Sequence, residues 1–196
     1  MPNWCYNSLS VSHENPEMIE RFVKATENES LLKEFCPIPE EIINTTSPSP
    51  DNVTLIEKYG ASDWYSWSLN NWGTKWDISD AYADCIDKNS VTASFNTAWS
   101  PPIQFYHKLV TLGFTVDATY TEEGMGFAGH FENGVDDCID LDFDDKSQGW
   151  IDQIDDEILR EVVQDQFDQW FEYNVVKTST KLKSNVNEIA SKSRKF

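Results

Sequence analysis

The chain has 196 residues, of which 39% are hydrophobic, so it can build one globular core with additions. Its 34 acidic and 15 basic residues give a formal net charge of −19. Such a charge repels nucleic acid and anionic membranes and attracts basic partners. No apolar run approaches the roughly 20 residues of a membrane span, and the start of the chain does not resemble a signal peptide. We therefore expect a cytoplasmic protein.

The negative charge is unevenly distributed along the chain. Residues 1–119 hold 16 acids and 7 bases, whereas residues 120–170 hold 16 acids and only 2 bases. Residues 177–196 reverse the sign, with 6 bases and 1 acid. The sequence therefore predicts an acidic region followed by a basic tail.

The four cysteines, Cys5, Cys36, Cys85 and Cys138, are far apart and form no C-x-x-C pair. This spacing suits neither a zinc knuckle nor a dense disulfide framework. We expect reduced, mostly buried thiols, and we expect neither a metal nor a cofactor.

The first third of the chain begins with a strand and a helix. Alternating polarity predicts a strand over residues 4–11. Asn15 can cap a helix that starts at Pro16 and continues with apolar residues at helical spacing. Residues 29–60 are interpreted as a connection or insertion, and the aromatic content of residues 64–69 predicts a second strand, followed by a turn.

The middle of the chain repeats the order of strand and helix. Alternation predicts a strand over residues 91–95. The helix that follows is expected to be capped by Ser100, to have Pro101 at its first position and to stop at Gly113. Residues 114–121 show the clearest alternation in the chain, which indicates another strand.

The acidic region starts with further strands and ends in a helix. We predict strands over residues 125–131 and 139–143, then a long acidic helix over 155–173. The polar, basic tail from Lys177 has enough apolar residues for one side of a helix.

This order of elements is the split βαβ pattern of a ferredoxin-like α+β fold with an antiparallel sheet, two packed helices, extra strands and a C-terminal acidic helix. The predicted organisation is a domain over residues 1–135 with an insertion at about 29–60. An acidic strand and helix over 136–176 are expected to pack on it, and 177–196 form the basic tail.

Four separated segments, in order along the first 135 residues, resemble the YubB-like or Api ninety-two-like family of small phage and plasmid proteins. They are Met1-Pro2-Asn3-Trp4-Cys5-Tyr6-Asn7, Asn71-Trp72-Gly73-Thr74-Lys75-Trp76, Phe95-Asn96-Thr97-Ala98-Trp99-Ser100-Pro101-Pro102 and Glu122-Glu123-Gly124-Met125-Gly126-Phe127-Ala128-Gly129. The resemblance implies a ferredoxin-like domain and a bacteriophage protein acting in the host bacterial cytoplasm. It implies no catalytic residues.

Trp72, Lys75, Trp76 and Trp99 allow two interpretations. They can form an aromatic pocket in which Lys75 binds a phosphate or carboxylate, or the tryptophans can simply close one end of the sheet. A deep pocket lined by Lys75 would favour a small-ligand-binding or enzymatic protein, and a solid aromatic plug would remove that alternative.

Several sequence patterns resemble known binding motifs only in part. Gly124, Gly126 and Gly129 have dinucleotide-fingerprint spacing but follow a turn and precede no helix. The run Asp140 to Asp144 starts like a calcium loop, but Asp145 and Ile151 stand where glycine and glutamate are required. The three histidines, His13, His107 and His130, show no metal-ligand spacing. We therefore expect a non-catalytic protein.

Recognition of RNA by the sheet is disfavoured because the body without its tail carries −24 and has no RNP-type segment. Mimicry of nucleic acid remains open, since 24 charges match about 40 Å of duplex, which is close to the expected diameter of the body. A plain solubilising role for the acids is the alternative.

These observations predict a phage protein that binds and interferes with a basic host or anti-phage defence protein, such as a nucleic-acid-binding protein. The basic tail could in addition mediate homo-oligomerisation. The predicted partner-binding carboxylates are Asp136, Asp137, Asp140, Asp142, Asp144, Asp145, Asp152, Asp155, Asp156 and Glu157.

Overall fold

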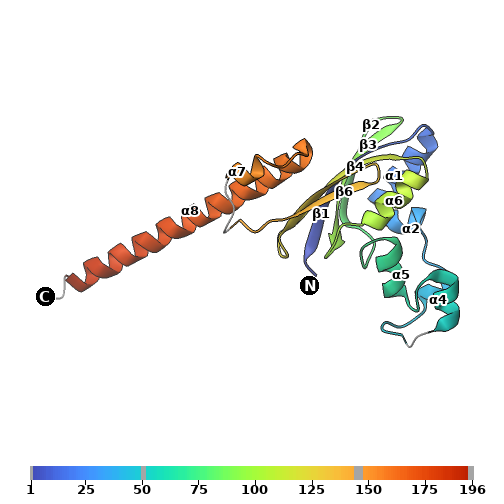
Figure 1. The fold of residues 1–196 in the computed structure, drawn as a ribbon, viewed down its shortest axis with the longest axis horizontal. Coiled ribbons are helices and arrows are strands. Elements are labelled where there is room, and N and C mark those ends of the chain that lie inside the picture. Colours follow the sequence, from blue (N-terminus) through green and yellow to red (C-terminus); the bar gives the residue numbers. More distant parts are fainter. Residues whose placement is uncertain (1, 50–51, 144–147, 194–196) are drawn as a thin grey trace. The chain divides into compact units, whose positions relative to one another are not determined.

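The computed structural model describes residues 2–49, 52–143 and 148–193, with side chains up to residue 177 (Figure 1). The chain divides into two compact units, residues 1–140 and 141–196. The first unit is α+β and contains a six-stranded antiparallel sheet.

The sheet has the strand order β2-β3-β1-β4-β5-β6. Strand β1 lies between β3 and β4, and Ser8 pairs with Ser94 on one side and Thr119 on the other. Burial alternates along β1 because successive side chains point to opposite faces. The strands are β1 (Trp4–Ser12), β2 (Ser79–Asp87), β3 (Ser90–Ala98), β4 (Thr115–Glu122), β5 (Phe127–Glu132) and β6 (Val135–Asp140).

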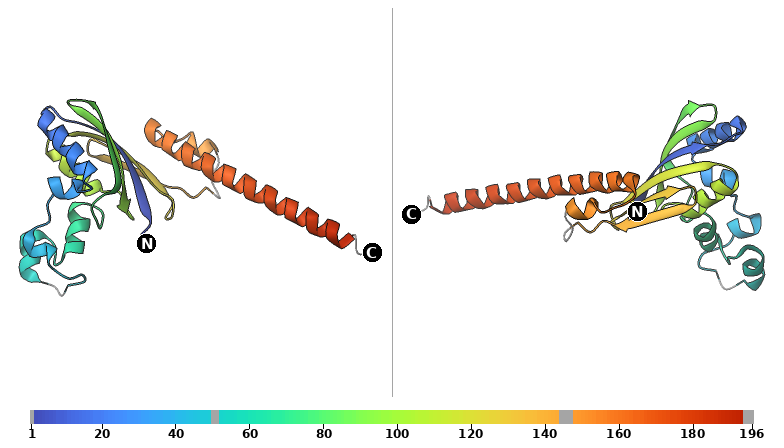
Figure 2. Two further views of the ribbon diagram at one scale, coloured as in Figure 1. Left: turned by 180° about the vertical axis from the view of Figure 1, so that it is seen from behind. Right: turned by 45° about the horizontal axis from the view of Figure 1, so that its top comes forward.

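Helices α1 (Pro16–Glu27) and α6 (Ile103–Thr111) cover one face of the sheet (Figures 1 and 2). The predicted start of α1 is confirmed, because the Asn15 side chain accepts a hydrogen bond from the Glu17 N–H. The start of α6 is not as predicted: the helix begins two residues later and has no side-chain cap. Ser100 instead donates its hydroxyl to the Gly73 carbonyl at 2.6 Å.

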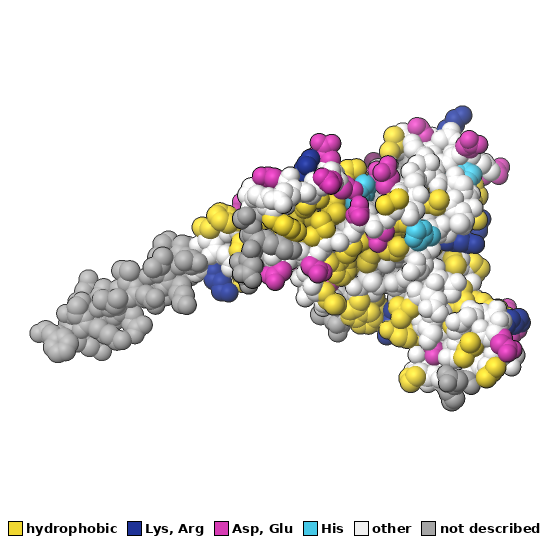
Figure 3. Space-filling view, in the orientation of Figure 1, with side chains coloured by type: hydrophobic (Ala, Val, Ile, Leu, Met, Phe, Trp, Pro, Cys, Tyr) yellow, Lys and Arg dark blue, Asp and Glu magenta, His cyan; other side chains and the backbone are white. Residues whose placement is uncertain are grey.

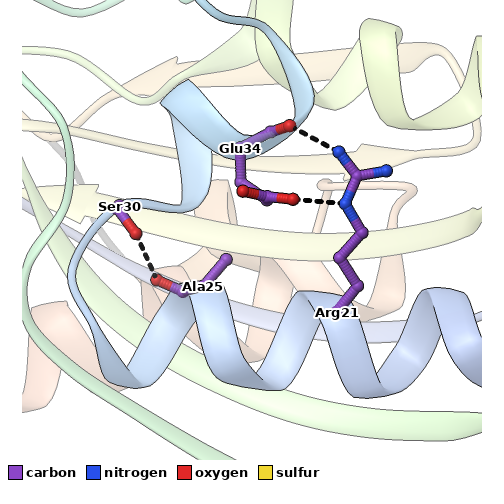
Figure 4. A network of polar contacts seen from close by, with 4 residues as sticks. All are labelled: Arg21, Ala25, Ser30 and Glu34. Atoms are coloured by element: carbon purple, nitrogen blue, oxygen red, sulfur yellow. Dashed lines mark hydrogen bonds and ion pairs between the residues drawn. The ribbon is translucent and has the colours of Figure 1, made fainter.

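The predicted insertion at residues 29–60 contains three short helices, α2 (Leu31–Phe35), α3 (Glu40–Ile43) and α4 (Val53–Tyr59). Figure 4 shows how α2 is joined to α1: Arg21 donates to both the side chain and the backbone carbonyl of Glu34. Because two nitrogens of the Arg21 guanidinium donate to the same residue, these hydrogen bonds fix the orientation of the guanidinium relative to α2.

The strand predicted over residues 64–69 is wrong. Residues Trp64–Asn71 form helix α5, which Asp63 caps by accepting a hydrogen bond from the Ser66 N–H at 2.9 Å. Aromatic content indicates a buried surface but does not distinguish a helix from a strand, and the capping aspartate was the informative residue. Residues Ser79–Asp87, where the sequence pattern favours neither a helix nor a strand, form β2.

Strands β4 to β6 extend the sheet on one side. Tyr120 of β4 lies across Gly129 of β5, where an added Cβ would be 2.1 Å from the tyrosine ring, and its hydroxyl donates to Asp136 of β6 at 2.8 Å. Asn133 and Gly134, both with positive φ, form the two-residue turn between β5 and β6. The glycine at 129 therefore makes room for a side chain that links three strands.

The second unit contains α7 (Gln148–Ile151) and α8 (Glu157–Ser193). Leu159 and Val163 of α8 are buried, and Phe167 and Trp170 pack on Phe143 with ring centroids 5.4 and 6.0 Å away. The predicted acidic helix is confirmed, but its predicted end is wrong. It continues through the basic segment to Ser193.

Two further expectations can be compared with the structure. All four cysteines are free, yet Cys85 and Cys138 are exposed, so the expectation of mostly buried thiols holds for Cys5 alone. Both exposed thiols lie on the edge strands β2 and β6, where no neighbouring strand covers them on one side. None of the described helices is long and apolar enough to cross a membrane.

Candidate functional site

The four sequence segments that resemble the phage and plasmid family meet at one end of the sheet. Trp4 at the start of β1 pairs with Ala98 at the end of β3, and Glu122 at the end of β4 pairs with Phe127 at the start of β5. We call this region the aromatic end, formed by residues 3–7, 72–76, 95–100 and 122–127 together with helix α5.

Hydrogen bonds join the loops of the aromatic end. The Trp99 N–H donates to the Asn3 carbonyl at 3.0 Å, and the Thr74 hydroxyl donates to the Ala98 carbonyl at 3.0 Å. A Cβ on Gly73 would lie 3.0 Å from the backbone nitrogen of Ile103, so this glycine allows the two loops to approach closely. Three of the segments are thereby held in one arrangement.

The fourth segment, residues 122–129, joins them through Glu122. Its buried carboxylate accepts hydrogen bonds from the backbone N–H groups of Gly124 and Met125. A Cβ on Gly124 would collide with the Asn3 side chain, 2.5 Å from its nitrogen. Glu122 therefore shapes a turn that lies directly against the start of the chain.

A buried polar chain runs beneath these loops. The Tyr106 hydroxyl donates to the Asn7 side-chain oxygen at 2.8 Å, and the Asn7 amide donates to the Thr97 hydroxyl at 2.9 Å. The Thr97 hydroxyl donates in turn to the Ser100 carbonyl at 2.8 Å. Burial raises the pKa of Cys5 to about 12 and that of Tyr106 well above its usual value, so both side chains are neutral at physiological pH. This buried series of hydrogen bonds is therefore a scaffold of neutral groups.

Trp72 lies inside the core. It is 1% exposed, stacks edge-on against Trp67 and donates its indole N–H to the Cys36 carbonyl at 2.8 Å. Its role is structural, which separates it from the other members of the predicted aromatic pocket.

Lys75, Trp76 and Trp99 lie at the surface of the aromatic end. Trp76 and Trp99 are 41% and 37% exposed, and their ring centroids are 5.7 Å apart. The Lys75 ammonium lies over both rings and also over Trp64 and Tyr65 of helix α5. Sequence reasoning missed Trp64 and Tyr65 because they were assigned to a strand. A helical reading from Asp63 would have placed them at the start of α5.

The predicted partner-binding carboxylates do not all lie in one element. Asp136 and Asp140 share one face of β6 and Asp137 lies on the other, because strand side chains alternate. Asp136 accepts the Tyr120 hydroxyl, and partial burial of its carboxyl raises its pKa. These three residues belong to the sheet of the first unit.

The remaining predicted carboxylates lie in the second unit or outside the described residues. Asp142, Asp152, Asp155 and Glu157 are exposed, and Asp156 accepts a hydrogen bond from the Leu159 N–H as the cap of α8. Asp144 and Asp145 fall outside the described residues.

Helix α8 carries a stripe of carboxylates, of which sequence reasoning singled out only Glu157. Its members are four, four, three and four residues apart, so they share one side of the helix, and all are exposed. They lie opposite the packed side that contains Leu159 and Val163. We call this set the acidic stripe: Glu157, Glu161, Asp165, Asp168 and Glu172.

In each unit, acidic side chains are visible at the surface in Figure 3. Among residues 148–176 there are 8 acids and 1 base, Arg160, which lies 3.5 Å from Glu157 and also donates to the Ile154 carbonyl. One base cannot neutralise the stripe, so a strong negative field surrounds this part of α8.

The histidines are separate from one another. His13 accepts from the Asn15 N–H and packs on Phe114, His107 packs on Phe131, and His130 lies 3.1 Å from Asp117. Among the described residues, no group of three His, Cys, Asp or Glu side chains could hold a metal ion.

Two surface depressions lie elsewhere in the first unit. One, of about 600 Å³, is lined by residues that include His13, Asn89 and Gly113. The other, of about 330 Å³, lies between α1 and α2, where Arg21 is already paired with Glu34.

No family model matches the chain, and no curated protein sequence matches it. Among solved structures, the chain is similar to the crystal structure of protein api92 from Yersinia pseudotuberculosis, of family DUF1281. The two are 10% identical, the match covers 71% of this chain and 98% of the other, and the TM-score is 0.44. Membership of the phage and plasmid family remains a prediction from the four segments.

Proposed function

We propose that this protein is a non-catalytic binding protein that captures a basic protein partner through the acidic stripe of α8. The observation that carries the proposal is the exposure of five carboxylates along one side of a helix whose other side is packed. Carboxylates in a row attract lysine and arginine side chains at long range and accelerate the encounter.

The spacing of the stripe favours a protein partner over close mimicry of nucleic acid. From Glu157 to Glu172 the helix rises about 22 Å, at roughly 1.5 Å per residue. Five charges over that length are about 5.6 Å apart along the axis, whereas one DNA strand carries a charge about every 3.4 Å. The stripe is thus less dense than a single strand. The exposed aspartates of β6 would supply further contacts to the same class of partner, and nucleic-acid-binding proteins are the obvious basic candidates.

We extend the proposal to the biological setting implied by the resemblance, a phage protein that interferes with a host or anti-phage defence protein in the bacterial cytoplasm. We also assign the first four strands, with α1 and α6, to a ferredoxin-like split βαβ arrangement. The order β2-β3-β1-β4 supports this assignment.

A charge-matched pair of variants tests the function. The stripe variant carries Glu161→Gln, Asp165→Asn and Asp168→Asn, and the control carries Glu17→Gln, Glu20→Gln and Glu27→Gln on exposed positions of α1. Both lose three negative charges. Each protein is immobilised, incubated with bacterial lysate at low and high salt, and the retained proteins are identified by mass spectrometry.

We expect the unchanged protein and the α1 control to retain the same basic protein at low salt and to release it at high salt, since salt screens exposed charges. The stripe variant should lose it. If both variants lose the basic protein equally, net charge alone accounts for its retention. If the unchanged protein retains it equally at low and high salt, the proposal is contradicted.

A further inference from the structure

The Lys75 ammonium lies in a box of four aromatic rings. Its nitrogen is 4.4 Å from the Trp76 ring centroid and 5.2 Å from that of Trp99. The centroids of Tyr65 and Trp64 lie 5.6 and 5.9 Å away. All four distances fall within the roughly 6 Å over which a cation is attracted to a ring face. The box therefore holds the ammonium at a defined position on the surface.

No carboxylate whose side chain the structure describes lies within ion-pair distance of Lys75, although the chain has 34 acids. The aromatic rings stabilise the charge, and the ammonium donates no hydrogen bond to a side chain or carbonyl among the described residues. A lysine ammonium has three N–H donors. Because Lys75 is only half-buried, these donors remain accessible to a ligand.

The box is held in place by the loops around it. Trp99 has a φ of 65°, a left-handed backbone conformation that is unfavourable for a residue with a Cβ. Its N–H is held by the Asn3 carbonyl, and the neighbouring Ser100 hydroxyl is held by the Gly73 carbonyl. Such strain persists only where the surroundings enforce it, and it is concentrated at functional sites. These contacts keep Trp99 beside Lys75 in spite of its unfavourable backbone conformation.

The ammonium lies over the rings of Trp76 and Trp99, and both indoles are partly exposed beside it. Ring faces carry partial negative charge and so stabilise the ammonium. An anionic group can bind the ammonium from the solvent side, and a flat apolar group attached to it can rest on the exposed indoles. The net charge of −19 opposes ligands that carry several negative charges, such as nucleotides.

We propose that Lys75, Trp76 and Trp99 form a binding site for a single carboxylate attached to, or next to, an aromatic ring. The ammonium binds the carboxylate and the two indoles contact the ring. Such a group can come from a small aromatic acid or from the C-terminus of a peptide that ends in an aromatic residue. The site lies in the first unit and does not depend on the acidic stripe of α8.

The test uses the full chain labelled with ¹⁵N and follows the indole N–H signals of Trp76 and Trp99, assigned with Trp76→Phe and Trp99→Phe. Benzoate is the probe for a small acid and benzamide is its neutral counterpart. N-acetyl-tryptophan and its amide form the corresponding pair for a peptide C-terminus. Ionic strength is kept constant throughout.

We expect saturable shifts of both indole signals with the carboxylates, and affinities about tenfold or more above those of the amides, as a charge-assisted hydrogen bond provides. Lys75→Met keeps the apolar stem and removes the charge, so it should abolish this difference. Lys58→Met, which removes an exposed lysine of α4 that pairs with Glu41, should leave it unchanged.

Benzoate binding shows that a small acid suffices, and binding of N-acetyl-tryptophan alone assigns the site to peptide C-termini. Equal affinities for the acids and their amides in the unchanged protein would overturn the proposal without any variant. The absence of shifts with all four probes would do the same. Retention of the preference in Lys75→Met would also contradict it. Loss of charge-dependent capture by the stripe variant has no bearing on these outcomes.

Discussion

At the aromatic end of the sheet, loops from distant parts of the sequence are joined by hydrogen bonds, and Trp72 is enclosed in the core. Along α8, by contrast, the acidic stripe is exposed and its members contact few other groups. Both regions carry proposed binding functions. The first depends on the positions of individual atoms, whereas the second depends on charge per unit length.

This difference sets how each region responds to change. A displaced ring or a lost acceptor at the aromatic end leaves a cavity or an unpaired donor, and either costs free energy of unfolding. A neutralised carboxylate on α8 removes only part of a field that water and salt already weaken. Stability measurements should therefore separate the two regions.

The largest effect is expected for Trp72→Ala. Removing an indole that is 1% exposed should lower the free energy of unfolding by about 3–5 kcal/mol, as for other buried large aromatics. Urea denaturation measures it. Trp76→Ala, at the surface of the same region, should stay within about 1 kcal/mol. Similar losses for both variants would contradict the division between a buried and an exposed tryptophan.

An intermediate effect is expected for Asp77→Ala. Asp77 accepts hydrogen bonds from the backbone N–H groups of Leu32, Lys33 and Ile78, and so caps the start of α2 from outside the helix. Removing these acceptors should cost about 1–3 kcal/mol at neutral pH.

The cost of Asp77→Ala should also depend on pH. Burial raises the pKa of Asp77 above its ordinary value of 3.8. A raised pKa in the folded state adds a pH-dependent contribution to stability, which is complete below 3.8 and is lost as pH rises through the folded value, while the hydrogen bonds to the backbone remain. The difference in unfolding free energy between the two proteins should thus be larger at low pH than at pH 7. A constant difference, or the opposite trend, would show that Asp77 is not desolvated.

The smallest effect is expected from neutralising Glu161 and Asp165 to Gln and Asn. Like charges four residues apart destabilise a helix by about 0.2–0.5 kcal/mol, so stability should stay within about 0.5 kcal/mol and rise slightly at low salt. Thermal unfolding at two salt concentrations checks it. A loss above about 1 kcal/mol would show that the stripe has a structural partner.

Much of the fold could be predicted from local patterns. The α+β class, the helix after Asn15 and the strand over residues 114–121 follow from capping and alternation, which are properties of neighbouring residues. Helix α5 was missed because the spacing of its aromatic residues fits a helix as well as a strand. The helix-capping residue Asp63 would have indicated the helix. The end of α8 was missed because a change in charge sign is not a helix stop signal.

The candidate site was less accessible to sequence reasoning. The sequence groups Trp72, Lys75, Trp76 and Trp99, whereas the structure brings only the last three together and places Trp72 in the core. That division depends on packing. Trp64 and Tyr65 reach Lys75 only through the tertiary fold. Asp136 and Asp137, adjacent in the sequence, point to opposite faces because they lie in β6. The sequence predicted this strand over residues 139–143, too late in the chain to include them.

The central position of β1 has a consequence for the order of synthesis. This strand precedes both of its neighbours in the sheet along the chain, and they contribute Ser94 and Thr119 as partners of Ser8. During translation β1 must wait until β3 has been made before one edge can pair, and until β4 has been made before the other can. Contacts this distant in sequence slow folding and leave strand edges open meanwhile. The helices α1 to α5, made in that interval, are the elements available to shield its apolar face before the sheet closes.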